Sequence, residues 1–239
     1  MNKITKILMA MIFVFTAATT ANAGKVYVGT NSSFAPFEYK KGGEIVGFDM
    51  DLIKAIADVA KIEIEIKDMS FDGLLPALQM KKIDMVMSGM TATDDRRKSV
   101  DFSNPYYSTS QVVLTQKDAE DIASFDDLKG KKVGVPLGTT SDVLVTKVEG
   151  TDIVRYKQAY MAILNLNNKK VDAVVLDKEQ AHGFIEQNKH LKINTAKAGE
   201  EEYSMAVGKG NKELLEKLNA ALKVLKENGT YDKLIKKWF

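Results

Sequence analysis

The sequence contains no cysteine, and that absence excludes several classes of protein. Without thiols the chain forms no disulfide and offers no thiolate as a nucleophile or metal ligand. It also lacks the N-terminal cysteine on which a bacterial lipoprotein carries its lipid. We therefore expect a free protein whose hydrophobic core alone stabilises the fold.

Long hydrophobic runs are also scarce, and the one notable run lies at the N-terminus. Lys3 and Lys6 precede an apolar stretch from Ile7 to Phe15, and small residues follow up to Ala21-Asn22-Ala23. This pattern is typical of a secretory signal peptide, here residues 1–23, with cleavage before Gly24 and export to the periplasm. The alternative is a membrane anchor, but the run is well short of the ~20 residues that a spanning helix needs.

An excess of either charge is absent once residues 1–23 are removed. Their loss takes two lysines from the 34 basic residues and leaves 32 basic against 32 acidic residues. A net charge of zero gives no reason to expect nucleic acid or an anionic membrane as a partner. The remaining 216 residues suffice for one large domain or two small ones.

Strand and helix patterns alternate along this mature chain. KVYVGT (25–30), IEIEI (62–66) and IDMVM (83–87) have the composition of strands. Helical spacing of apolar residues occurs between them, at Leu52, Ile53, Ile56 and Ala60 and again in LLPALQMKK (74–82). Alternation of this kind predicts an α/β fold with mostly parallel sheets and crossover helices.

One unit of this pattern occurs twice. LLPALQMKKIDMVMSG (74–89) aligns without a gap with AILNLNNKKVDAVVLD (162–177), which pairs Gly89 with Asp177. Two copies predict two similar α/β lobes. We place lobe 1 at residues 24–108 plus 204–239 and lobe 2 at 109–203, because extended crossovers are expected within 105–116 and near 202–205. Two crossovers form a hinge, and a hinge between two lobes forms a cleft.

In α/β sheets, ligands bind beyond the carboxyl ends of the strands, so the residues found there are the candidates for a site. After IDMVM, Gly89 permits close backbone approach, Thr91 offers a hydroxyl, and Thr93 is a credible helix cap before Arg96. An inward-facing Arg96 would suit a carboxylate. The alternative is that the cluster of Arg96, Arg97 and Lys98 is a solvated surface neutralised by Asp94 and Asp95.

The other strand ends supply complementary groups. Thr139 and Thr140 follow Gly138 at a predicted helix start, which is either an anion site or a plain helix cap. Asp177 ends an apolar strand and is either a cap or a cation ligand. Phe34 is a cleft wall or a core residue, and Phe71 is a loop platform before a helix starting near Gly73, or a packing residue at the helix start. Together these groups fit an amino acid zwitterion.

A set of ordered motifs resembles a known family, the periplasmic polar-amino-acid-binding proteins of ABC importers (solute-binding protein family 3). The motifs, in chain order, are FAPFEY (34–39), GFDMDL (47–52), FDGLLPAL (71–78), SGMTATDDR (88–96), DFSNPYY (101–107), GTT (138–140) and NGTYDKLIKKW (228–238). The resemblance covers essentially all of residues 24–239. It implies a two-lobed, type II clamshell that closes on one amino acid, without cofactor or metal, and that partners a membrane permease.

The resemblance also implies roles for individual residues. Arg96 would bind the ligand carboxylate with the Thr91 and Thr140 amides, and Asp177 would bind the ammonium with the Gly89 carbonyl and the Thr91 hydroxyl. The aromatics would flank the ligand side chain. The full candidate set is Asn31, Phe34, Phe71, Gly89, Met90, Thr91, Arg96, Thr139, Thr140 and Asp177.

Ligand identity depends on less specific signals. Asn31 stands where several relatives carry an acid, and its amide, with the hydroxyls of Ser32 and Thr139, can bond a guanidinium, an ammonium or an amide. We expect a basic or polar amino acid, arginine first and lysine, histidine or glutamine after it. We also expect a monomer, because each lobe must remain free to move.

Two other functions use the same fold. An enzyme related to cyclohexadienyl or arogenate dehydratases would need an acid–base group over the substrate. His182 and His190 are the two histidines, and both fall at predicted surface positions. A sensor domain is the third possibility, and it would have to act through a separate partner.

Overall fold

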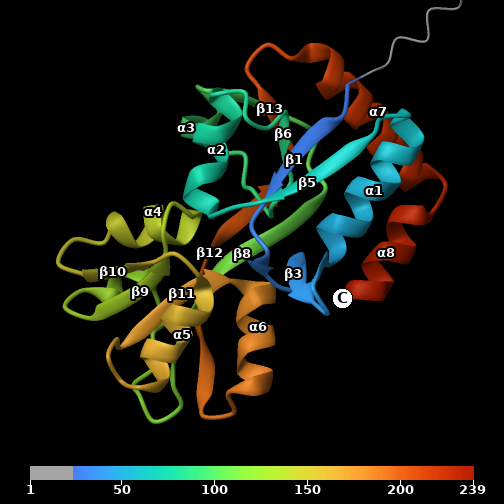
Figure 1. The fold of residues 1–239 in the computed structure, drawn as a ribbon. Coiled ribbons are helices and arrows are strands. Elements are labelled where there is room, and N and C mark those ends of the chain that lie inside the picture. The colour runs from blue at the N-terminus through green and yellow to red at the C-terminus, as the bar shows by residue number, and fades with distance from the viewer. Residues whose placement is uncertain (1–23) are drawn as a thin grey trace, which may run out of the picture.

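The computed structural model describes residues 24–239, so the predicted signal peptide lies outside the described residues. Two five-stranded sheets form the frame of this part of the chain. Figure 1 shows the first sheet with α1, α7 and α8 beside it, and the second sheet with α4, α5 and α6 around it. This is the predicted α/β arrangement with two centres of packing.

The first sheet has the strand order β5-β1-β6-β13-β7. Strand β1 pairs in parallel with β5 and β6, whereas β13 returns antiparallel to β6 and β7. The strands are β1 (Val26–Thr30), β5 (Ile64–Asp68), β6 (Met85–Val86), β7 (Val100–Phe102) and β13 (Ala206–Gly208). Its helices are α1 (Phe48–Ala60), α2 (Phe71–Gln79) and the short α3 (Asp94–Arg97).

The second sheet has the order β10-β9-β11-β8-β12. Strands β9, β10 and β11 run parallel, and β8 and β12 lie antiparallel at one side. The strands are β8 (Tyr107–Gln116), β9 (Lys132–Pro136), β10 (Asp152–Tyr156), β11 (Ala173–Asp177) and β12 (Leu191–Tyr203). The helices are η1 (Phe125–Leu128), α4 (Thr140–Thr146), α5 (Ala159–Asn167) and α6 (Lys178–Gln187).

The internal repeat of the sequence reappears in the backbone. Helix α2 and helix α5 begin and end at positions that differ by the same 88 residues. Lys81 and Lys169, which the repeat pairs, both adopt a left-handed conformation, with φ of 56° and 54°. A left-handed residue ends each helix and turns the chain into the next strand. The two copies therefore put Gly89 and Asp177 at equivalent strand ends.

Strands β8 and β12 connect the two halves. They pair antiparallel from Leu191 opposite Gln116 to Tyr203 opposite Tyr107, beside the first sheet. In Figure 1 both strands run between the two halves of the molecule. The predicted extended crossovers thus form one antiparallel ribbon.

The C-terminal helices pack against the first half of the molecule. Helix α7 (Lys212–Glu227) buries Leu214, Leu218, Leu222 and Leu225 in the core that α1 shares, and α8 (Thr230–Trp238) follows it. A small sheet of β2 (Ser33–Phe34), β3 (Glu38–Lys41) and β4 (Glu44–Val46) leads into α1. Within residues 24–239, no helix is both long and apolar enough to cross a bilayer.

Candidate ligand-binding site

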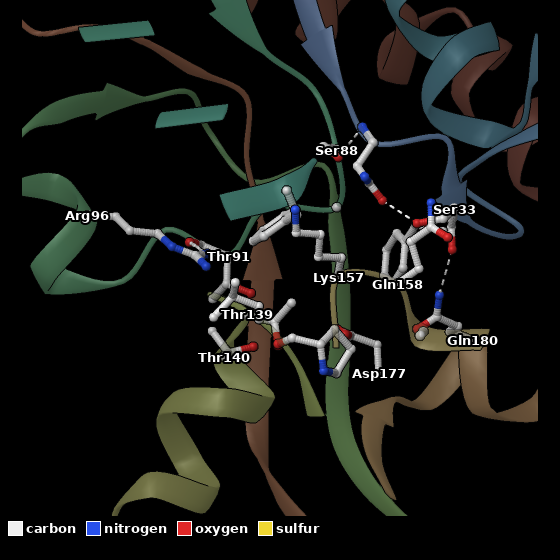
Figure 2. Close-up of a pocket in the computed structure, with 17 residues that line it drawn as sticks. Ser33, Ser88, Thr91, Arg96, Thr139, Thr140, Lys157, Gln158, Asp177 and Gln180 are labelled. Atoms are coloured by element: carbon white, nitrogen blue, oxygen red, sulfur yellow. Dashed lines mark hydrogen bonds between the residues drawn. The ribbon is translucent and has the colours of Figure 1, made fainter. Parts of the chain in front are cut away.

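A cavity of ≈ 540 Å³, its open mouth included, lies where the strand ends of the two sheets face each other. Figure 2 shows its labelled polar side chains converging from both halves. The lining residues are Asn31, Ser33, Phe34, Phe71, Ser88, Gly89, Thr91, Arg96, Pro136, Leu137, Thr139, Thr140, Lys157, Gln158, Ala159, Asp177 and Gln180.

Arg96 points into this cavity, not into solvent with its neighbours. Its guanidinium donates to the Thr91 carbonyl at 2.8 Å and to the Gly138 carbonyl of the second half at 3.0 Å. The guanidinium carbon lies 5.3 Å from the ring centroid of Phe71. Burial lowers the pKa of Arg96, and the charges of Glu201 and Asp177 oppose that shift. An arginine stays protonated in proteins, so the cavity contains a fixed cation.

The neighbouring cations remain outside. Arg97 lies over Phe102, and Lys98 forms an exposed ion pair with Asp95 at 2.6 Å. Thr93 caps α3 by accepting the Arg96 amide at 3.3 Å. Helix α3 is only four residues long, and Arg96 and Arg97 lie in its last turn. The cations therefore do not oppose a long helix dipole.

Asp177 supplies the opposite charge. It ends β11 and precedes α6, yet its side chain makes no capping hydrogen bond to that helix. Its Oδ1 accepts from Gln111 Nε2 at 2.9 Å and from the Tyr203 hydroxyl. Burial raises the pKa of Asp177 to about 7, against the effect of the Tyr203 hydrogen bond. A buried carboxyl with this pKa is poised to ionise fully when a cation approaches.

Gly89 allows an aromatic ring to form one wall. Its φ is +48°, and a Cβ built there would lie 2.3 Å from Cε1 of Phe34. Phe34 is half-buried and stacks on Phe37 with ring centroids 5.1 Å apart. The ring thus packs against the core and also faces the cavity, so both interpretations of Phe34 apply.

Two fully buried carboxyl groups accept hydrogen bonds from Ser88 and Gly89. Glu38 accepts from the Ser88 hydroxyl at 2.6 Å, and Asp49 accepts from the Gly89 amide at 2.9 Å. Burial raises the pKa of Asp49 to about 6 and, with the nearby charge of Asp49, raises that of Glu38 well above its ordinary value. Hydrogen bonds to these carboxyls fix the turn that Gly89 makes at the cavity floor.

Other predicted residues reach the cavity with part of their hydrogen bonding already used. The Thr139 hydroxyl caps α4 and donates to the Pro136 carbonyl at 2.8 Å. Asn31 donates from its amide to the Met69 carbonyl at 2.8 Å, and its oxygen accepts from Ser33. Asn31 nevertheless keeps an amide hydrogen and a lone pair for a ligand.

Known proteins provide an independent test of the family assignment. The model of the bacterial extracellular solute-binding proteins, family 3, matches residues 26–239. The chain belongs to this family. It is 40% identical over 213 residues to a probable histidine-binding protein of Campylobacter jejuni, covering 88% of this chain and 83% of that protein. It is 38% identical over 239 residues to the arginine-binding extracellular protein ArtP of Bacillus subtilis, covering 95% and 93%.

Solved structures agree with the fold. A structure of an ancestral arginine-binding protein bound to arginine superimposes with a TM-score of 0.87 at 46% identity, covering 90% of this chain and 98% of that one. These comparisons confirm the predicted family and its two-lobed fold.

Nine of the ten predicted site residues line the cavity in this family 3 protein, and Met90 does not. The Met90 side chain is 1% exposed and packs with Leu74, Val86 and Val100. It lies between Gly89 and Thr91, and it faces the core while its two neighbours face the cavity. Ser32 also lies outside the lining set, because its hydroxyl donates to Asp68 at 2.7 Å.

Phe71 lines the cavity, but the predicted loop position is wrong. Helix α2 begins at Phe71, with Ser70 as the preceding extended residue, so Pro76 lies inside the helix. The Gly73 amide donates to the Ser70 carbonyl at 3.0 Å and closes a first turn before the proline. Pro76 has no backbone N–H, so α2 lacks one hydrogen bond, and this short helix tolerates that loss.

Sequence reasoning missed several lining residues. Lys157 and Gln158 directly follow β10, where the strand-end rule would have found them had the DIVRY strand been recognised. Gln180, in the first turn of α6, donates to the Ser33 carbonyl of the first half at 3.1 Å. Glu201 does not line the cavity but accepts hydrogen bonds from the lining residues Thr91 and Thr140, and it was also missed, because it lies within strand β12 and does not follow a strand end.

Proposed function

We propose that this chain is an extracytoplasmic receptor for a polar L-amino acid with a basic side chain, which it delivers to an ABC importer. The observation that carries the proposal is the presence of Arg96 and Asp177 in one cavity, each with its side chain directed inward. A cation and an anion held apart in one cleft match the two charged ends of an amino acid. The names of the relatives support the same conclusion.

The carboxylate of the ligand would bind Arg96, whose planar guanidinium offers paired donors. The amides of Thr91 and Thr140, one from each half of the molecule, would add two further donors. The ammonium would bind Asp177, with the Gly89 carbonyl and the Thr91 oxygen as neutral acceptors. In that arrangement each charged end of the ligand meets an opposite charge, as burial requires.

The ligand side chain would extend between Phe34 and Phe71 toward Asn31, Gln158 and Gln180. Oxygens of these amides can accept from a guanidinium, and their N–H groups can donate to a neutral amide. We favour arginine, with lysine, histidine or glutamine as further candidates. Solved relatives include an ancestral arginine-binding protein bound to glutamine, at 47% identity, which supports this range.

Delivery would depend on closure of residues 24–108 plus 204–239 onto residues 109–203. In the structure, Arg96 and Gln180 each donate across the cleft, to Gly138 and Ser33. The two charged ligand contacts come from opposite walls, so a bound amino acid favours the closed form over an open one. The permease of the importer would then recognise the closed surface.

The cellular setting follows from the same proposal. The signal peptide would be cleaved before Gly24, and the mature protein would act in the periplasm as a monomer without nucleic acid. A role in catalysis has no support among the relatives, which are named as binding proteins.

A thermal-shift panel of the twenty amino acids tests this function. The protein comprising residues 24–239 is purified through a denaturing step, refolded, and so stripped of ligand. At 100 times its Kd, a ligand adds about 2.7 kcal/mol to stability. Stabilisation by arginine or another polar amino acid supports the receptor; a folded protein that responds to none of the twenty contradicts it, and turnover of prephenate or arogenate would favour an enzyme.

A further inference from the structure

Glu201 lies behind the wall of the cavity, where three elements meet. It is on β12, opposite Thr109 of β8. One carboxylate oxygen, Oε2, accepts from the Thr91 hydroxyl at 2.8 Å and from the Thr140 hydroxyl at 2.7 Å. Gln111 Nε2 also approaches it at 3.4 Å. Thr91 comes from the first half of the molecule and Thr140 from the second, so this oxygen joins the two walls of the cleft.

The direction of these hydrogen bonds determines what the threonines can do. An ionised carboxylate only accepts, and each hydroxyl has a single proton. Thr91 and Thr140 therefore use their protons on Glu201. Toward the cavity, the Thr91 oxygen presents lone pairs and no hydrogen. A hydroxyl held in this way suits an ammonium and cannot donate to a carboxylate.

The negative charge of Glu201 also favours an ammonium over a carboxylate. It opposes the lowering of the pKa of Arg96 that burial causes, and it adds to the raising of the pKa of Asp177, so its field reaches both charged groups of the site. Gln111 connects the two acids, since its Nε2 also donates to Asp177 Oδ1 at 2.9 Å and to Thr140 Oγ1 at 3.1 Å. Asp177, which lines the cavity, and Glu201, which lies behind its wall, thus belong to one hydrogen-bonded group of acids.

We propose that Glu201 is a positioning residue that orients the Thr91 and Thr140 hydroxyls, so that the site recognises the α-ammonium of its ligand, and that it links the two walls of the closed cleft. This inference rests on the proposed function. It means that Glu201, which does not itself line the cavity, makes this part of the site bind the ammonium of the zwitterion and not its carboxylate.

The test uses Glu201→Gln, with Glu202→Gln as the matched control, because Glu202 is the exposed neighbour on the same strand. The probes are L-arginine and 5-guanidinopentanoate, which is the same molecule without its α-amino group. Calorimetry gives the Kd of 5-guanidinopentanoate divided by the Kd of L-arginine, and this ratio measures the preference for the α-ammonium. We expect the ratio to fall about tenfold in Glu201→Gln, because the ammonium loses an oriented acceptor and a nearby charge. The control should keep the wild-type ratio.

An unchanged ratio in Glu201→Gln overturns the proposal, even if both probes bind more weakly, because a merely structural role weakens both equally. A second readout needs no ligand. Small-angle X-ray scattering of the ligand-free proteins should show a more open Glu201→Gln than wild type or control. If the wild type binds no arginine, the proposed ligand is wrong, and scattering alone then decides the role of Glu201: a more open variant supports it, and identical curves overturn it.

Discussion

The ring of Phe34 occupies the space that a side chain on Gly89 would need. A Cβ at Gly89 would lie 2.3 Å from Cε1 and 2.9 Å from Cδ1 of Phe34. Gly89 also has a φ of +48°, which disfavours any other residue. The glycine and the aromatic wall of the cavity are therefore one structural unit.

Gly89→Ala should weaken ligand binding by at least about tenfold, since Phe34 must move out of the wall. Gly42→Ala is the matched control, because Gly42 has a φ of +61° and a Cβ added there would meet nothing within 4 Å. It introduces a similar backbone strain, of order 1 kcal/mol, without the clash. Calorimetry on both variants separates the two effects. Equal affinities in both variants would contradict the role of Phe34.

Asp177 should destabilise the ligand-free protein as the pH rises. Burial raises its pKa from 3.8 to about 7, so the folded state holds the proton more tightly than the unfolded chain. Stability is then full below about pH 4 and is lost as the pH rises through 7. Asp177→Asn removes this loss, and we expect its free energy of unfolding to exceed that of the wild type by roughly 1–3 kcal/mol at pH 8.

Urea denaturation at pH 5 and pH 8 measures this difference. Glu38 and Asp49 titrate in both proteins, and the charge of Asp177 has only a small effect on the pKa of Glu38, so most of their contribution cancels in the comparison. The advantage of Asp177→Asn should be smaller at pH 5 than at pH 8. An advantage that is the same at pH 5 and pH 8 would show that Asp177 is already ionised in the folded protein at pH 5, so that its pKa is not raised into this range.

The affinity for L-arginine should follow the same ionisation. The ammonium needs a charged Asp177, so the Kd should rise about tenfold for each pH unit below 7 and level off above it. Titrations near pH 6.5 in buffers of different ionisation enthalpy should report a proton released on binding. Equal Kd values at pH 5.5 and pH 8 would show that Asp177 is already ionised in the ligand-free protein at pH 5.5, which would contradict the raised pKa and the coupled loss of its proton on binding.

Lys157 is the second cationic residue of the lining set, after Arg96. It is exposed at the end of β10, so its repulsion of a basic ligand side chain is modest. Lys157→Ala should tighten L-arginine binding by roughly two- to fivefold and leave glutamine binding unchanged. Lys178→Ala, outside the cavity, is the control. If Lys157→Ala changes the Kd of L-arginine and the Kd of glutamine by the same factor, the arginine side chain does not lie near Lys157.

The fold and much of the candidate site can be predicted from the sequence, because helices and strands alternate in a repeated pattern and the site lies at the strand ends. The gapless match of 74–89 with 162–177 predicts two equivalent units, and α2 and α5 indeed share their bounds after a shift of 88 residues. The strand-end rule then locates Gly89, Thr91, Thr139, Thr140 and Asp177 at one cavity.

The remaining features depend on contacts that have no local signal. Phe71 begins a helix that its proline suggested would start later. Glu201 reaches Thr91 over 110 residues of chain, through a hydrogen bond that strand pairing makes possible. Strand patterns reveal which face a residue is on, but not which distant hydroxyls approach it.

The most direct test of the account is a calorimetric titration of L-arginine into the protein comprising residues 24–239, with Arg96→Ala and Arg97→Ala beside the wild type. Arg96 lines the cavity, whereas Arg97 lies over Phe102 at the surface. The account predicts that Arg97→Ala binds like the wild type. Arg96→Ala should lose roughly 2–5 kcal/mol of binding free energy while its circular dichroism spectrum is unchanged. Wild-type affinity in a folded Arg96→Ala would contradict the assignment of the carboxylate to Arg96, and with it the proposed orientation of the ligand.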